Sequence, residues 1–162
     1  TIENVHKTLQ NDMPADKKAK EKIGILLSKN KELLKSRLLF DGGAFQDGLS
    51  VLLKIDKSNL PSDQLIEYYY RIARVYQELN LLDLATSNFL LVVFKSNKDS
   101  KTYFAPYSCL QLGIIYLSKN NKTKAQQYIK SGLSYKHYEY KTTVKVQLNK
   151  VASVIDEKEI TK

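Results

Sequence analysis

The chain has 162 residues, of which 43% are hydrophobic, and a formal net charge of +9. This length is enough for one continuous helical core, and glycine and proline are too scarce for a disordered chain. No apolar run approaches the roughly 20 residues that span a bilayer, and the single cysteine, Cys109, excludes an internal disulfide.

Residues 1–14 predict a short helix or a linker. Ile2, Val5 and Leu9 recur at helical spacing, and Pro14 ends the pattern. The segment begins without an initiator methionine or the hydrophobic region of a signal peptide, so we expect an excised piece of a larger protein or a mature form. The compartment is left open, with the cytoplasm slightly favoured over the periplasm.

The segment from about residue 16 to 57 predicts a degenerate helical hairpin, the first of three. A long helix is expected from about Asp16 to Phe40, followed by a turn at Gly43. The second helix carries the pattern Gly48-x3-Leu52-x2-Ile55. Lys35-Ser36 stands where the later copies have an apolar residue and a small one, which makes this copy the weakest.

One spaced pattern then occurs twice, forty residues apart, within hairpins expected at about residues 63–96 and 102–134. The copies read Tyr69-x2-Ile72-Ala73-x2-Tyr76-x8-Ala85-x3-Phe89-x2-Val92 and Cys109-x2-Leu112-Gly113-x2-Tyr116-x8-Ala125-x3-Ile129-x2-Gly132. Because the eight-residue gap is too long for one apolar stripe, each copy predicts two antiparallel helices.

Asn80 and Asn120 fall in those gaps, at the position that Gly43 holds in the first hairpin. Asparagine and glycine tolerate the left-handed backbone that commonly ends a helix, so the three residues predict equivalent turns. The small residues Ala73 and Gly113 are expected to let two helix backbones approach closely.

With these residues in place, the chain resembles tetratricopeptide repeat sequences, whose helix–turn–helix unit of 34 residues has the same order of aromatic, small and aliphatic positions. Two clear copies cover about residues 65–133 and the degenerate one about residues 30–57. The resemblance implies an all-α fold of stacked antiparallel hairpins in a short right-handed superhelix. The longer spacing places extra residues in the segment 95–104, which predicts a longer connection plus an extra turn on the next helix, with Pro106 in its first turn.

A final helix is expected at about residues 141–157. Val144, Leu148, Val151 and Ile155 form one apolar stripe on an otherwise polar segment. At the end of a repeat array, such a stripe most simply covers the last hairpin, so this helix is predicted to be a cap. The hairpins and the cap together predict one repeat domain over about residues 15–158.

The positive charge is mostly lysine spread along the chain, which is typical of a solvated surface. Only Arg37, Arg71 and Arg74 are arginines, whereas readout of bases or phosphates commonly uses clustered arginine. Lysine-mediated binding of nucleic acid or another acidic polymer is therefore an outsider hypothesis. Such binding would weaken steeply with added salt.

No catalytic, metal or cofactor site is predicted. His6 and His137 lie far apart in the chain, and neither has an acidic or cysteine partner at helical spacing. Asp41-Gly42-Gly43 lacks the strand, lysine and hydroxyl residue of a phosphate-binding loop. Cys109 is expected on an inward helical face as a small buried residue. We therefore expect a protein without enzymatic activity.

The resemblance also implies a concave groove lined by the first helix of each hairpin. The positions that match the family's groove are Leu33, Arg37, Phe40, Glu67, Tyr70, Arg74, Gln77, Glu78, Tyr107, Leu110, Ile114 and Leu117. Arg71 and Gln111 stand where chaperone-binding members have asparagine in a carboxylate clamp, which disfavours capture of a chaperone tail. A groove that is partly polar and partly aliphatic would suit an amphipathic helix or an extended peptide.

Two main hypotheses about function remain open. The favoured one is a non-catalytic scaffold that binds a peptide or helical segment of a partner protein in the groove. The alternative is a structural or regulatory module of a larger protein whose groove packs against its own other domains. Leu110, Ile114 and Leu117 are equally explained as residues covered by the cap or a neighbouring domain. Self-association through the ends of the array is also compatible with the sequence.

Overall fold

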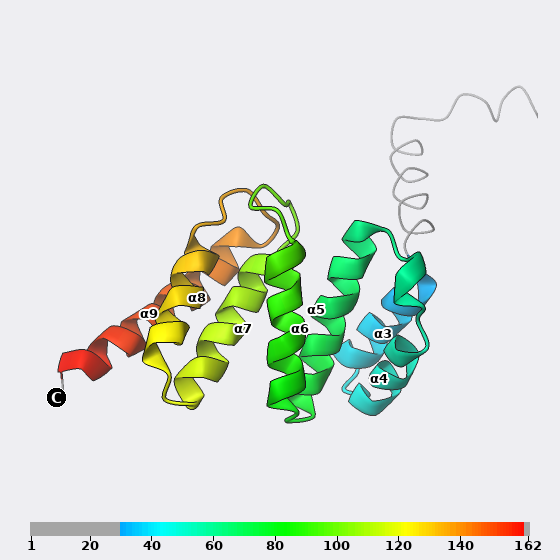
Figure 1. The fold of residues 1–162 in the computed structure, drawn as a ribbon, viewed down its shortest axis with the longest axis horizontal. Coiled ribbons are helices and arrows are strands. Elements are labelled where there is room, and N and C mark those ends of the chain that lie inside the picture. Colours follow the sequence, from blue (N-terminus) through cyan, green and yellow to red (C-terminus); the bar gives the residue numbers. More distant parts are fainter. Residues whose placement is uncertain (1–29, 161–162) are drawn as a thin grey trace, which may run out of the picture.

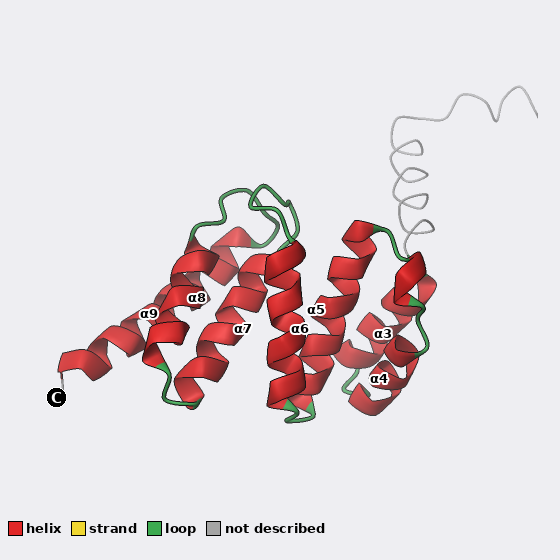
Figure 2. Ribbon diagram, viewed as in Figure 1, coloured by secondary structure: helices red, strands yellow, loops and turns green. Residues whose placement is uncertain are grey.

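The computed structural model describes residues 30–160, with side chains described as far as Asp156. Within this range the chain forms seven α-helices and one 3-10 helix and contains no strand (Figure 2). The predicted all-α class is therefore confirmed. The expected N-terminal helix or linker and the first part of the expected long helix lie outside the described residues. None of the helices described is both long and apolar enough to cross a membrane.

Consecutive helices form three hairpins followed by a single helix (Figure 1). The hairpins are α3 (Lys31–Asp41) with α4 (Phe45–Leu53), α5 (Ser62–Glu78) with α6 (Leu82–Lys95), and α7 (Phe104–Ser118) with α8 (Lys122–Leu133). The 3-10 helix η1 (Lys57–Asn59) lies between α4 and α5, and α9 (Lys141–Ile160) ends the array. Each helix packs on the next, and α3, α5, α7 and α9 also pack on one another in that order. The first helices of the hairpins therefore share one face.

The turns inside the three hairpins share one backbone geometry. Gly43, Asn80 and Asn120 have positive φ angles of 77°, 58° and 56°. The N–H of the following residue donates to the carbonyl oxygen five residues earlier at 2.8 Å in every turn, from Ala44 to Leu39, from Leu81 to Tyr76 and from Asn121 to Tyr116. A left-handed residue closes helix C-termini with this bond. The predicted equivalence of the three turns is confirmed.

Small residues at matching positions let the paired helices approach closely. Gly113 of α7 lies so near α8 that an added Cβ would stand 2.5 Å from Cδ1 of Ile129. Ser36 holds the corresponding position of α3, where it is buried and its hydroxyl donates to the Leu33 carbonyl at 2.8 Å. The first hairpin therefore keeps a small residue at this contact, although its sequence departs from the repeat pattern.

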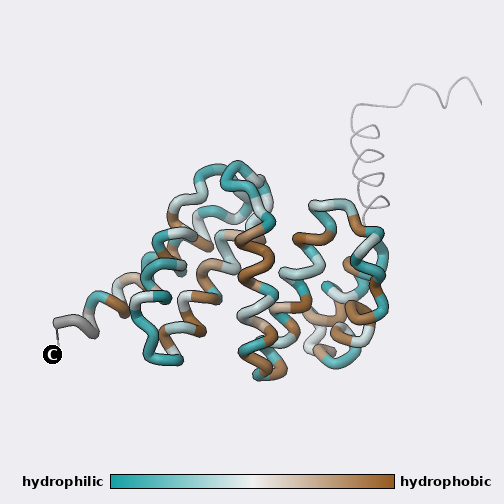
Figure 3. Tube along the Cα trace, viewed as in Figure 1, coloured by the Kyte–Doolittle hydropathy of each residue, from teal (hydrophilic) through white to brown (hydrophobic). Residues whose placement is uncertain are grey.

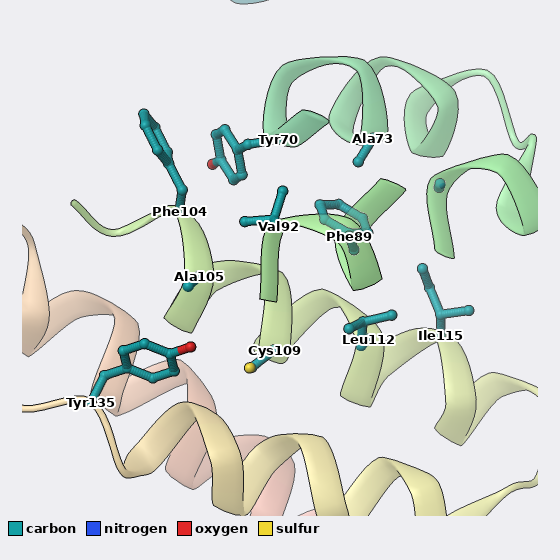
Figure 4. Packing of buried hydrophobic residues seen from close by; sticks show 11 residues of the cluster. Tyr70, Ala73, Phe89, Val92, Phe104, Ala105, Cys109, Leu112, Ile115 and Tyr135 are labelled. Atoms are coloured by element: carbon teal, nitrogen blue, oxygen red, sulfur yellow. The ribbon is translucent and has the colours of Figure 1, made fainter. Parts of the chain in front are cut away.

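The core follows the array as three clusters of buried side chains. The central cluster joins α5, α6 and α7 and contains Phe89, Val92, Cys109 and Leu112 (Figure 4). A second cluster lies between the first hairpin and α5, and a third between α7, α8 and α9. In contrast, the two loops at the upper end of the array are largely hydrophilic (Figure 3). Each hairpin therefore buries its apolar side chains against its neighbours.

α9 covers the third hairpin, as predicted for a cap. Its Val144, Leu148 and Ile155 are buried against α7 and α8, and Val151 is half-buried. Gly132 of α8 allows this approach, because an added Cβ there would stand 2.8 Å from Cδ2 of Leu148.

The long helix expected from about residue 16 to 40 does not run through Asn30. Asn30 has a non-helical backbone, and its side-chain oxygen accepts hydrogen bonds from the N–H groups of Glu32 and Leu33 at 3.0 and 3.2 Å. Such a side chain satisfies N–H groups that have no partner within a helix. α3 therefore begins at Lys31, and the prediction of one continuous helix is wrong.

The extra residues between the second and third hairpins lengthen only their connection. α7 begins 12 residues before Tyr116, whereas α5 begins 14 residues before the matching Tyr76, so the predicted extra helical turn is wrong. Pro106 explains the start, because a residue without an N–H is tolerated only in the first turn of a helix. Phe104 is accordingly the first residue of α7.

The connection over residues 96–103 is held against the loop over residues 134–140 (Figure 1). The Glu139 N–H donates to the Lys101 carbonyl at 2.9 Å. The Lys98 ammonium donates to Oγ of Ser134 at 2.9 Å and lies 3.9 Å from the centre of the Tyr135 ring. These contacts join the second hairpin to the cap across the top of the third.

Candidate partner-binding groove

The face shared by α3, α5, α7 and α9 is hollowed at three places. The largest, here the apolar groove, has a volume of about 520 Å³ and is lined by Tyr107, Leu110, Gln111, Ile114, Leu117, Gln147, Lys150, Val151 and Val154. The second, the arginine hollow, has a volume of about 90 Å³ and is lined by Ser36, Arg37, Phe40, Asp41, Tyr70, Arg71, Arg74, Val75 and Tyr103. The third, the acidic hollow, has a volume of about 190 Å³ and is lined by Arg37, Asp63, Glu67, Arg71, Thr102, Tyr103, Phe104, Glu139 and Tyr140.

All three arginines of the chain line the arginine hollow, and two of them already have acidic partners. Arg71 forms an ion pair with Glu67 one helical turn away, and both side chains are largely buried. Arg37 pairs with Asp41 at 3.6 Å, where both side chains are more than half exposed. Arg74 is the exception, because no carboxylate among the side chains described lies within 4.0 Å of it, and Glu78, one helical turn along α5, acts on it only from farther away.

Arg74 is held instead by aromatic side chains. Its guanidinium carbon lies 4.5 Å from the ring centre of Phe40 and 5.2 Å from that of Tyr107. Its Nη1 donates to the Tyr70 hydroxyl at 3.2 Å. The two cation–π contacts, with Phe40 and Tyr107, each contribute roughly 0.5–2 kcal/mol, depending on how much water they exclude. The guanidinium of Arg74 thereby joins α3, α5 and α7 on the groove face.

Tyr70 forms the base of this arrangement. Its ring is buried and meets the rings of Tyr103, Phe104 and Tyr107 at centre-to-centre distances of 5.6, 4.7 and 5.9 Å. Burial raises the pKa of the Tyr70 phenol well above its ordinary value, although the positive charge of Arg74 opposes the shift. Tyr70 therefore stays neutral and offers Arg74 a hydroxyl acceptor.

A pair of amides links the second and third hairpins beside these rings. Nε2 of Gln77 donates to Oε1 of Gln111 at 2.7 Å. Gln111 also lines the apolar groove, so this bond fixes one polar side chain at its wall.

The apolar groove lies between α7 and α9. Leu110, which is 1% exposed, forms its floor, whereas Ile114 and Val154 are each 39% exposed on its two walls. The exposed side chains of Gln147 and Lys150 lie along the α9 wall. Apolar surface of this kind, with polar residues around it, is typical of a binding groove.

Most of the residues predicted for the groove line these hollows, but three do not. Leu33 lies three residues before Ser36 on the same side of α3, so it is buried in the core cluster of the first hairpin. Glu78 is exposed outside the hollows. Gln77 lines none of the hollows and is connected to the apolar groove only through its hydrogen bond to Gln111. Leu33 is therefore a core residue in the fold as it stands.

Several lining residues come from segments that were not expected in the groove. On α9, Gln147, Lys150, Val151 and Val154 recur at steps of three and four. That spacing would have revealed a groove face if the cap had been treated as the first helix of a further unit. Tyr103 lies in the irregular connection before α7, where no periodicity points to its position.

Other chemistry is scarce in the part of the chain that the structure describes. No group of three or more His, Cys, Asp and Glu residues between 30 and 156 could hold a metal ion. Cys109 is fully buried, and burial raises the pKa of its thiol to about 11. The thiol therefore stays protonated near neutral pH, and the protonated form is a poor nucleophile.

Comparisons with known proteins agree with the fold. A family model described as the SusR N-terminal TPR domain matches residues 26–89, and one described as a tetratricopeptide repeat matches residues 106–136. No curated protein and no solved structure was found to match the chain. The two matched segments cover more than half of the chain and contain all three hairpin turns, at Gly43, Asn80 and Asn120. The chain therefore belongs to the tetratricopeptide repeat family.

Proposed function

We propose that this chain is a non-catalytic scaffold that binds a peptide or helical segment of a partner protein in its groove. Tetratricopeptide repeat domains generally mediate protein–protein interactions and typically have no catalytic role. In this chain the partner would bind on the face formed by α3, α5, α7 and α9.

The apolar groove is the observation that carries this proposal. Ile114 and Val154 keep aliphatic surface exposed on facing walls above a buried Leu110. Removing such surface from water contributes about 25 cal/mol for each Å² that a partner covers. A peptide helix or an extended strand with apolar side chains is the ligand that gains most from this shape.

Paired variants test whether the partner binds on this face. Ile114→Asp combined with Arg74→Glu changes two groove residues that retain some exposure, whereas a substitution at the buried Leu110 would disrupt the core. Phe94→Asp is the matched control, because Phe94 is 85% exposed on α6 and lines none of the three hollows.

We expect affinity capture from the source cells to recover the same partner with wild-type protein and Phe94→Asp, and to lose it with the groove variant. Circular dichroism must first show equal helicity for all three proteins. A partner retained by the groove variant but lost by Phe94→Asp would place binding elsewhere and reject the proposal.

The alternative is a module whose groove packs against other domains of its own longer protein. The description of the first matching family model favours it, because it names an N-terminal domain, which implies further sequence in that protein. The two hypotheses differ in the source of the ligand. If the groove normally holds another part of the same polypeptide, that flanking segment should bind this chain when it is produced separately. If the ligand comes from a different protein, the flanking segment should not bind.

A further inference from the structure

We propose that the groove selects a segment with one carboxylate followed by apolar side chains, with the carboxylate on Arg74 and the apolar side chains between α7 and α9. The inference rests on the proposed function, because it names the chemistry of the partner at the same face.

The charges in the arginine hollow are not balanced. Glu67 and Asp41 neutralise Arg71 and Arg37, whereas Arg74 has no carboxylate within 4.0 Å among the residues described. Glu78, one helical turn along α5, acts on Arg74 only at longer range and lines none of the hollows, so the positive charge of Arg74 has no salt bridge. A single carboxylate from a partner would complete a salt bridge with Arg74.

The side chain of Arg74 is already oriented by its neighbours. Phe40 and Tyr107 hold its guanidinium from two helices, and Tyr70 takes up only one of its N–H groups. The guanidinium has five N–H donors in a fixed plane, so donors remain for a carboxylate. Because the side chain is fixed before binding, little conformational entropy is lost when the carboxylate arrives.

Tyr107 connects the two parts of the site. Its ring contacts Arg74 and also lines the apolar groove. From Tyr107 to Leu117, α7 advances about 15 Å, which is the length of about ten helical residues or four to five extended ones. The bound segment would place its carboxylate near Tyr107 and its apolar side chains toward Leu117.

The relative sizes of the two hollows fit this division. The arginine hollow has less than a fifth of the volume of the apolar groove, about 90 Å³ against about 520 Å³. The smaller therefore suits one polar group and the larger suits several side chains.

A polyanion fits the site less well than a single carboxylate. The acidic hollow, which shares Arg37 and Arg71 with the arginine hollow, adds the carboxylates of Asp63, Glu67 and Glu139. A nucleic-acid backbone continuing past Arg74 in that direction would meet these negative charges at close range. An acidic and apolar peptide can instead turn into the apolar groove, where Lys150 is the charged residue of the wall.

Selection from a random peptide library displayed on phage tests the inference, with the full chain as bait. We expect enriched peptides to share one Asp or Glu at a fixed distance from two or more apolar residues. Enriched peptides that need Ile114 but show no acidic preference would overturn this inference and leave the proposed function standing. A selection without enrichment, or with peptides that still bind the Ile114→Asp variant, would reject both.

Charge variants then test the role of Arg74 directly. Replacing the acidic residue of an enriched peptide by its amide should weaken binding to wild-type protein by about tenfold, because a hydrogen-bonded ion pair is lost. Arg74→Lys should retain part of this preference, and Arg74→Glu should reverse it toward Lys or Arg. Lys145→Glu is the control, because Lys145 is exposed on α9 and lines none of the hollows.

A short labelled oligonucleotide separates the peptide from a nucleic acid. We expect it to leave the bound peptide in place at physiological salt. Displacement of the peptide by the oligonucleotide, with a steep dependence on salt, would overturn the inference in favour of an acidic polymer. An unchanged peptide preference in Arg74→Glu, with helicity intact, would also overturn it.

Discussion

Gly113 determines how closely the two helices of the third hairpin approach. A Cβ at this position would stand 2.5 and 2.8 Å from two carbon atoms of Ile129, which is itself buried. We expect Gly113→Ala to lower the free energy of unfolding by about 1–3 kcal/mol, because overpacking outweighs the gain in helix propensity. Urea unfolding followed by circular dichroism measures the change.

Gly48 provides the matched control for that substitution. It is also a helical glycine, but the atom nearest to an added Cβ is 3.5 Å away, which is ordinary contact. Gly48→Ala should therefore be neutral or stabilise the protein by up to about 1 kcal/mol. If both substitutions have the same effect, the close approach at Gly113 does not limit stability.

Burial of the Cys109 thiol makes the stability of the protein depend on pH in the alkaline range. Burial raises the pKa of its thiol from the ordinary value of 9.0 to about 11, so the unfolded chain loses this proton first as the pH rises. The contribution is complete below about pH 9 and is lost as the pH rises toward 11, by about 3 kcal/mol. Burial of Tyr135, whose pKa is raised to about 12 from 10.0, extends the loss to higher pH.

Urea midpoints at about pH 8 and about pH 11 measure this effect in wild-type protein and Cys109→Ala. The variant loses packing at both pH values, so only the difference between the two midpoints is informative. We expect the midpoint to fall less in the variant than in the wild type. Equal falls would show that the thiol proton is not coupled to folding.

The three hairpin turns are the elements whose residue requirements are clearest. Asn120 has a φ of 56°, a conformation that costs a residue with an ordinary Cβ about 1–2 kcal/mol. We expect Asn120→Ala to lower the thermal midpoint and Asn120→Gly to leave it unchanged or raise it slightly. If alanine is tolerated as well as glycine, the left-handed turn is not maintained in solution.

The hairpins were predictable because helix periodicity and turn residues can be recognised within short stretches of sequence. Local patterns do not identify every contact. Ser36 acts as a small residue at a helix contact, which is visible only when α3 is packed on its neighbours. The start of α3 was missed because the hydrogen bonds of the Asn30 side chain interrupt a stretch that reads as continuous helix.

The groove was partly predictable for a related reason. Matched positions on the first helices of the hairpins predict that Arg37, Tyr70 and Arg74 line the groove. The pairing of Arg71 with Glu67 and the place of Tyr103 depend on how helices and a long connection meet in space. Contacts of this kind have no periodic signature in the sequence.

Across the whole molecule, stability is distributed along the array and is not concentrated in one core. One buried cluster joins the first hairpin to α5, another fills the space between α5, α6 and α7, and a third joins α7, α8 and α9. In such an array each unit contacts only its neighbours, so a local defect should have a local effect. The two ends can therefore be perturbed separately.

Leu148→Ala and Leu52→Ala test this expectation as a reciprocal pair. Both leucines are fully buried, Leu148 in the cluster of the cap and Leu52 in that of the first hairpin. Each truncation should lower stability by about 2–5 kcal/mol, because it leaves a cavity. Hydrogen exchange read by mass spectrometry should then increase mainly in α7 to α9 for the first variant and in α3 to α5 for the second. A uniform increase along the chain in both variants would mean that the hairpins unfold as one cooperative unit, because a local loss would then be shared by every helix.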